Sequence, residues 1–234
     1  MTLPLIVAAA QPRIVGQDLA ANVAAHADAI RRSGARVVVF PELSLTGYEL
    51  DAPLVRADDP ALAPLVEACA DADAVAFVGA PIEWAGAPRI GVLKVTGTGV
   101  EPVYAKMCLG DAKPERFVPG PRPAVEIVDG WRIGIGVCKD TRILEHLRET
   151  RDEGVDLYAA GLVHRPDELF EFDARARRIA QKMGVPVVFA GFAGGTGAFE
   201  STSGGSGVWD ASGTLLAQAG PEPGEIVTAA LTPR

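Results

Sequence analysis

The chain has 234 residues, of which 48% are hydrophobic and 22% are charged, so it can bury a large core and is not a disordered chain. Its 30 acidic and 22 basic residues give a formal net charge of −8. Binding to nucleic acid or to an anionic membrane surface depends on clustered lysine and arginine, so this composition argues against both kinds of partner.

Apolar runs of strand length alternate with amphipathic stretches, and no linker composition interrupts them, so we expect one domain over residues 1–234. The patterns predict strands over residues 5–10, 36–40, 75–80, 90–96, 103–105, 125–128, 132–137, 157–160, 186–190, 207–210, 215–219 and 226–230. They predict helices over residues 19–33, 61–71, 142–153 and 168–183.

Two of the predicted strands, around residues 37–40 and 133–137, carry little or no polar alternation, so both of their faces must meet apolar partners. Twelve strands with four long helices do not fit a simple strand–helix repeat. We therefore expect an α/β fold in which two sheets pack together with helices outside.

The three cysteines, Cys69, Cys108 and Cys138, form no C-x-x-C pair, which argues against a disulfide framework and against a zinc knuckle. No basic residue precedes the apolar run over residues 3–10, and this run is too short to span a bilayer. A buried first strand and a cytoplasmic location are the expectations.

Cys138 closes the strand predicted over residues 132–137, and a helical pattern follows it. A thiol at such a junction gains acidity, because the amides of a helix N-terminus and the neighbouring Lys139 favour the thiolate. The alternative is a buried and inert cysteine, which is the usual fate of a free cysteine.

Two more polar residues follow apolar strands. Glu42 comes after residues 36–40, where burial would raise its pKa towards the range of a general base. The alternative for Glu42 is a carboxylate that caps the turn after Pro41. Lys106 follows residues 103–105, where a lone lysine would ordinarily be a solvated loop residue.

Glu42, Lys106 and Cys138 belong to a series of motifs that extends along nearly the whole chain. In chain order they are Ala9-Ala10-Gln11, Pro41-Glu42-Leu43 with Thr46-Gly47-Tyr48, Tyr104-Ala105-Lys106 with Leu109, Glu115-Arg116-Phe117 with Pro119-Gly120, Gly136-Val137-Cys138-Lys139-Asp140-Thr141-Arg142 with Glu145, and Gly205-Ser206-Gly207 with Asp210 and Gly213. Their order and spacing resemble the nitrilase superfamily of carbon–nitrogen hydrolases, whose members carry a Glu-Lys-Cys triad. The chain departs from the family at Lys182 and Met183, where Glu and Asn are common.

The resemblance implies a four-layer α-β-β-α sandwich that forms a homodimer. It also implies a hydrolase of non-peptide C–N bonds that acts on a small amide or N-carbamoyl compound without a metal or organic cofactor. In that reaction Cys138 attacks the substrate carbon and Glu42 is the base. Lys106, with the backbone N–H of Lys139, stabilises the oxyanion. Glu115 resembles the family's second glutamate, which holds the lysine or the substrate.

Candidate substrate-binding residues follow the same strand ends: Tyr48, Lys139, His164 and Arg165. Three of them are cationic or can become so, which favours a substrate with a carboxylate, such as a dicarboxylic monoamide or an N-carbamoyl amino acid. Alternatively, Lys139 and Arg165 form salt bridges with nearby acidic residues and do not meet substrate.

Two other functions stay open. Residues 201–207 are rich in serine, as in a different amidase family with a Ser-Ser-Lys centre, although a loop before a strand explains them better. The chain could instead be a catalytically silent binding or regulatory protein. The joint presence of four chemical groups argues against that alternative, namely Glu42, Lys106, Glu115 and Cys138.

Overall fold

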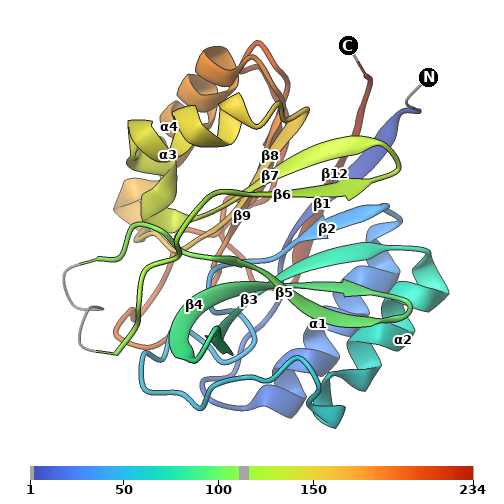
Figure 1. Cartoon of the computed structure of the whole chain (residues 1–234), viewed down its shortest axis with the longest axis vertical. Coiled ribbons are helices and arrows are strands. Elements are labelled where there is room, and N and C mark those ends of the chain that lie inside the picture. The colour runs from blue at the N-terminus through green and yellow to red at the C-terminus, as the bar shows by residue number, and fades with distance from the viewer. Residues whose placement is uncertain (1–2, 111–115, 234) are drawn as a thin grey trace.

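The computed structural model describes residues 3–110 and 116–233, and Figure 1 shows two β-sheets packed between two pairs of helices. Helices α1 (Leu19–Ser33) and α2 (Ala63–Ala72) cover one sheet, and α3 (Leu144–Asp152) and α4 (Leu169–Met183) cover the other. The short 3-10 helices η1 (Pro60–Leu62), η2 (Cys138–Arg142) and η3 (Pro166–Glu168) come before α2, α3 and α4. The predicted α-β-β-α sandwich is confirmed.

Each sheet has six strands, and in each sheet three neighbouring strands run parallel. The first sheet has the order β12-β1-β2-β3-β4-β5. Its members are β1 (Leu5–Gln11), β2 (Val37–Val39), β3 (Val75–Trp84), β4 (Ala87–Thr96), β5 (Gly99–Ala105) and β12 (Glu225–Leu231). The second sheet has the order β11-β10-β9-β8-β7-β6. Its members are β6 (Ala124–Val128), β7 (Trp131–Val137), β8 (Leu157–Leu162), β9 (Val187–Gly191), β10 (Gly207–Trp209) and β11 (Leu215–Gln218).

Every strand and every α-helix predicted from the sequence is present in the described residues, with shifts at the ends. The largest differences are the hairpin of β3 and β4, which extends past the apolar runs to Trp84 and Ala87, and the start of β5, which lies at Gly99 and not at residue 103. Cross-strand pairing in an antiparallel hairpin carries polar positions such as Glu83 and Arg89, which an apolar pattern does not reveal.

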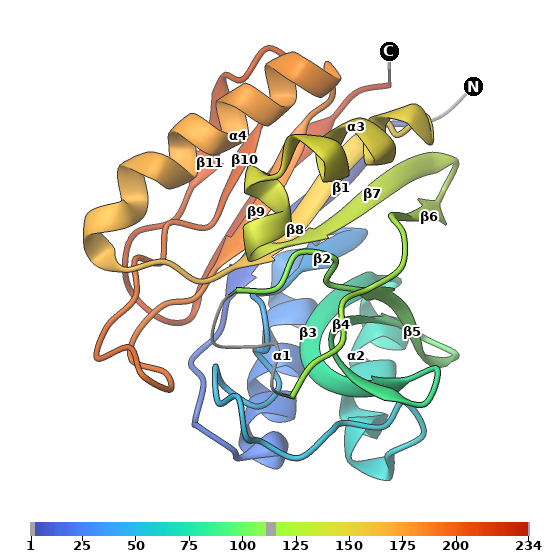
Figure 2. The ribbon, with the colours of Figure 1, turned by 60° about the vertical axis from the view of Figure 1, so that its left-hand side comes forward.

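Three layers of apolar side chains hold the sandwich together. The layer between the two sheets includes Val39, Phe77, Ile135 and Val188, each at most 2% exposed. Separate clusters fill the space between each sheet and its helices. Figure 2 shows α3 and α4 side by side over the second sheet. Because both faces of the central strands are covered, these strands lack polar alternation.

The segment that follows β2 passes between the two sheets at very close range. Gly79 of β3 and Gly161 of β8 flank its backbone, one from each sheet. A Cβ atom on Gly161 would lie 2.5 Å from the carbonyl oxygen of Phe40 and 2.7 Å from the amide nitrogen of Glu42. Only glycine fits there, and Glu42 is fixed between the sheets as a result.

In the part of the chain that the structure describes, no helix has the length and apolar character needed to cross a membrane. The cytoplasmic location and the homodimer stay predictions.

Replacing Gly161 by Ala should lower the free energy of unfolding by about 2 kcal/mol or more, because the added methyl group meets backbone atoms that cannot move aside cheaply. Chemical denaturation measures the change. Gly16→Ala is the matched control, since its Cβ would meet only the flexible end of Glu49 at 2.9 Å. Equal stability of the two variants would contradict the proposed close contact.

Candidate active site

A buried ion pair joins two segments that follow strands of the first sheet. Glu42 follows β2 and Lys106 directly follows β5, and each residue is 1% exposed. Lys106 Nζ donates a hydrogen bond to Glu42 Oε1 at 2.5 Å. Since a buried charge costs several kcal/mol unless it is paired, the two charges hold each other in place.

Lys106 is fixed by its backbone as well as by its side chain. Its N–H donates to the carbonyl of Ile90, and its own carbonyl accepts from Gly120, both at 2.8 Å. Burial alone would lower the pKa of the Lys106 ammonium, but the negative charges of Glu42 and Cys138 outweigh it and raise the pKa above its usual value. Lys106 is therefore a cation at neutral pH.

Cys138 is the first residue of η2, and its backbone has a φ of +43°. The left-handed region costs a residue with a side chain about 1–2 kcal/mol, and such strain is often found at functional sites. The half-buried thiol forms a long hydrogen bond of 3.9 Å to the carbonyl of Val163, at the end of β8. The backbone therefore turns sharply at the end of β7, and the Cys138 side chain lies at that turn.

Asp140 organises this turn, a role that the sequence did not reveal. Its buried carboxylate accepts from the Tyr104 hydroxyl and the Cys108 amide at 2.8 Å, and from the Val137 amide at 3.0 Å. These partners belong to β5, to the segment after Lys106, and to β7. Asp140 thus ties the lysine segment to the cysteine turn, and the motif residues next to Cys138 were its only signal in the sequence.

Tyr48 lies within electrostatic reach of Glu42 and Cys138. Burial and the charges of Glu42 and Cys138 raise the pKa of its hydroxyl well above the usual value. Its amide donates to Thr196 Oγ1 at 2.7 Å, and its ring meets the edge of Phe199 at 5.5 Å. The structure therefore brings Glu42 and Tyr48, Lys106, and Cys138 together from three separate segments.

The three cationic candidates lie in different surroundings. Lys139 follows Cys138 in η2, and its Nζ donates to the carbonyl of Leu109 at 2.8 Å. His164 is 2% exposed and packs against Phe172 of α4, and burial together with the charge of Arg175 lowers its pKa to about 3. Its imidazole is neutral at pH 7, so it adds no charge for a substrate carboxylate.

Arg165 is exposed and directly precedes η3, and its amide donates to Glu168 Oε2 at 2.8 Å. Its contact with substrate, like that of Tyr48, Lys139 and His164, stays a prediction. The predicted Glu115 lies outside the described residues. Its neighbour Arg116 donates from its guanidinium to the carbonyls of Leu50 and Ala52, near the Tyr48 segment.

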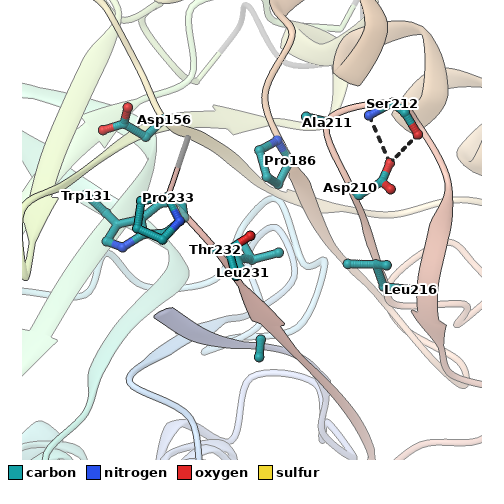
Figure 3. A pocket seen from close by; sticks show the side chains of 11 residues that line it. Trp131, Asp156, Pro186, Asp210, Ala211, Ser212, Leu216, Leu231, Thr232 and Pro233 are labelled. Atoms are coloured by element: carbon teal, nitrogen blue, oxygen red, sulfur yellow. Dashed lines mark hydrogen bonds between the residues drawn. The ribbon is translucent and has the colours of Figure 1, made fainter. Parts of the chain in front are cut away.

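A cavity of about 470 Å³ lies elsewhere in the fold (Figure 3). Trp131, Asp156 and Pro186 line it at the amino-terminal ends of β7, β8 and β9, so it lies at the opposite end of these strands from Cys138. Its Asp210 carboxylate accepts hydrogen bonds from Ser212 within a turn. Within residues 3–110 and 116–233, no cluster of His, Cys, Asp and Glu is arranged to hold a metal ion.

The fold is an α-β-β-α sandwich, and its candidate site has a buried carboxylate–lysine pair beside a cysteine on a strained turn. The family model for carbon-nitrogen hydrolases matches residues 6–234. The chain belongs to the carbon–nitrogen hydrolase family, as the sequence motifs predicted.

Similar proteins agree with this assignment. Hydrolase Rv0480c of Mycobacterium tuberculosis is 30% identical over 238 residues, which cover 91% of this chain and 84% of the relative. A variant of the amidase from Nesterenkonia sp. AN1, with the acetamide moiety of fluoroacetamide on its active-site cysteine, has a TM-score of 0.86 and 23% identity, covering 99% of this chain and 91% of that one. The CN-hydrolase superfamily protein XC1258 from Xanthomonas campestris, with an arsenic adduct in its active site, has a TM-score of 0.88 and 18% identity, covering 98% and 91%.

The three cysteines should differ sharply in reactivity. Burial raises the pKa of the Cys69 thiol to about 11, and burial with the Asp140 charge does the same for Cys108. At pH 8 only about one in a thousand of these two thiols is a thiolate. A limiting alkylating agent at pH 8 should therefore label Cys138 first, as measured by peptide mass spectrometry. Labelling of all three at similar rates is expected only after denaturation, and in the folded protein it would contradict the assignment.

His164 should make stability depend on pH. The unfolded imidazole binds a proton near pH 6.5 and the folded one only near pH 3, so the unfolded state gains protons first and stability falls as the pH drops below about 6.5. In His164→Gln this loss should shrink by up to roughly 3 kcal/mol between pH 6.5 and pH 4. Urea denaturation at several pH values measures it. Arg165→Ala is the control, and parallel curves for wild type and His164→Gln would overturn the prediction.

Proposed function

We propose that the chain hydrolyses the C–N bond of a small amide or N-carbamoyl compound through a thioester on Cys138. The observation that carries the proposal is the 2.5 Å ion pair of Lys106 and Glu42, buried beside the Cys138 turn. The charges of Glu42 and Cys138 both act on Lys106, which supports their proposed roles as base, nucleophile and oxyanion-binding cation. Membership of the carbon–nitrogen hydrolase family and the likeness to the Nesterenkonia amidase support the same chemistry.

In this mechanism Glu42 takes the proton from the Cys138 thiol as the sulfur bonds to the carbonyl carbon of the amide. Lys106 Nζ and the backbone N–H of Lys139 stabilise the oxyanion of the tetrahedral intermediate, a contact worth roughly 3 kcal/mol of barrier in other enzymes. The C–N bond then breaks, and Glu42 returns the proton to the leaving amine or ammonia. Water, deprotonated by Glu42, attacks the thioester and releases the acid, and the thiol regains its proton.

The candidate binding residues bear on the charge of the substrate. The neutral imidazole of His164 and the exposed position of Arg165 favour neutral small amides. Lys139, next to the nucleophile, is the feature that favours substrates with a carboxylate. If Arg165 or His164 recognises a carboxylate, their alanine variants should lose the preference for N-carbamoyl amino acids or dicarboxylic monoamides over neutral amides.

A screen of small amides for ammonia release tests the activity, and added hydroxylamine tests the intermediate. A thioester transfers its acyl group to hydroxylamine, so wild type should form a hydroxamate. Lys106→Met should lower kcat by about 100-fold or more through loss of the oxyanion contact. Cys138→Ala should form neither ammonia nor hydroxamate, whereas Cys108→Ala should stay within about twofold of wild type in kcat, because neither proposed step uses that thiol.

A catalytically silent protein would give the opposite pattern. It would release no ammonia from any amide, and its Cys138 would be alkylated no faster than Cys69 or Cys108. That combination would favour a binding or regulatory role over hydrolysis.

A further inference from the structure

The proposed mechanism leaves one buried charge without a role. Arg175 lies on α4 and is 4% exposed. Removing a guanidinium from water costs several kcal/mol, and proteins keep such a charge where a partner or a function compensates for it. The surroundings of Arg175 therefore indicate what it does.

Its ion pair is weak. In the described part of the chain, Arg175 forms a salt bridge only with Glu171, from Nη2 to Oε2 at 3.3 Å. The same oxygen accepts from Arg142 Nη2 at 2.9 Å, and the Glu171 side chain is 41% exposed. A half-exposed carboxylate shared by two arginines does not neutralise a buried guanidinium.

The other end of the guanidinium reaches the nucleophile's turn. Arg175 Nη1 donates to Thr141 Oγ1 at 3.2 Å, and the Thr141 hydroxyl donates to the carbonyl oxygen of Cys138 at 2.6 Å. Because the arginine N–H occupies the oxygen of the hydroxyl, the hydroxyl proton is directed at Cys138. This chain of two hydrogen bonds holds the strained Cys138 turn from α4.

The charge of Arg175 also acts on Cys138. Burial and the nearby Arg142 lower the pKa of Arg175, and the negative charge of Cys138 opposes this more strongly than that of Glu171. The interaction is reciprocal, so the positive charge of Arg175 favours the anionic form of Cys138. Lys106 is already paired with Glu42, and Arg175 is a second cation near the thiol.

Titratable and charged groups from every neighbouring segment surround Arg175 and Cys138. They are Glu42 and Tyr48 after β2, Lys106 after β5, Lys139, Asp140 and Arg142 in η2, His164 after β8, and Glu171 and Arg178 in α4.

We propose that Arg175 is a positioning residue for the nucleophile: its guanidinium orients the Thr141 hydroxyl that holds the Cys138 carbonyl, and its charge stabilises the Cys138 thiolate. The proposal rests on the proposed function, in which Cys138 is the attacking group. It concerns the thiol itself and does not depend on which amide is the substrate.

The test measures the rate of Cys138 alkylation by iodoacetamide from pH 5 to pH 10, with peptide mass spectrometry to assign the site. In Arg175→Met the pH midpoint of alkylation should rise by about one unit, which is about a tenfold slower reaction below the midpoint. Arg175→Gln keeps a donor for Thr141 and loses the charge, so it should show the same shift. Arg175→Lys keeps the charge and should restore the wild-type midpoint.

Arg177→Met is the matched control, because it removes the same charge from an exposed position of α4, where the guanidinium pairs with Asp173, and should leave the midpoint unchanged. Wild-type midpoints in Arg175→Met and Arg175→Gln, or an equal shift in Arg177→Met, would overturn the proposal. If Arg175→Met does not fold, the Gln and Lys variants carry the comparison.

Failure of the proposed function gives a different result. If no amide is hydrolysed but the alkylation midpoint shifts with the charge at position 175, the role of Arg175 stands and amide hydrolysis does not. If wild type hydrolyses amides and the pH midpoint of alkylation is the same in all variants of Arg175, hydrolysis stands and the role of Arg175 is refuted.

Discussion

The ion pair between Lys106 and Glu42 is the constraint on which the site depends. Both residues are 1% exposed, and the 2.5 Å contact joins the end of β5 to the segment after β2. Such pairs seldom add stability, since well-packed apolar residues of the same volume are often as stable or more so. A fold that keeps two charges inside its core gives up stability at that point, which is typical of a functional site.

The two sheets have to meet closely for this pair to face a cysteine from the opposite layer. Glu42 and Lys106 come from the first sheet, and Cys138 follows β7 of the second. Gly79 and Gly161 allow the Glu42 backbone to lie between the sheets, and the Asp140 carboxylate links the Cys138 turn to the segment after Lys106. Strand ends, glycine contacts and one buried carboxylate thus set the relative positions of Glu42, Lys106 and Cys138.

The sequence was sufficient for the elements and for the residues at strand ends, because apolar runs report burial and polar residues that close them stand out. Glu42, Lys106 and Cys138 were found in this way. Asp140 and Arg175 were not recognised, because their roles depend on partners far away in sequence, such as Tyr104 and Thr141. The neutral state of His164 could not be predicted either, since its pKa is lowered by burial under α4 and by an arginine that no local pattern connects to it.

The proposed reaction keeps the charge of this buried site constant. At rest the negative charge is on Glu42, opposite Lys106. When Glu42 takes the thiol proton it becomes neutral, and Lys106 loses its counter-ion as negative charge appears on sulfur and then on the substrate oxygen. The cation is therefore released from its pair at the moment when the oxyanion needs it, and no net charge is created in a region of low dielectric. The charge of Arg175 is not cancelled by Glu42, so it favours the states in which negative charge lies on sulfur or on the substrate oxygen. In the resting site, Glu42 offsets the charge of Lys106, so that Arg175 is the cation left to act on the thiol.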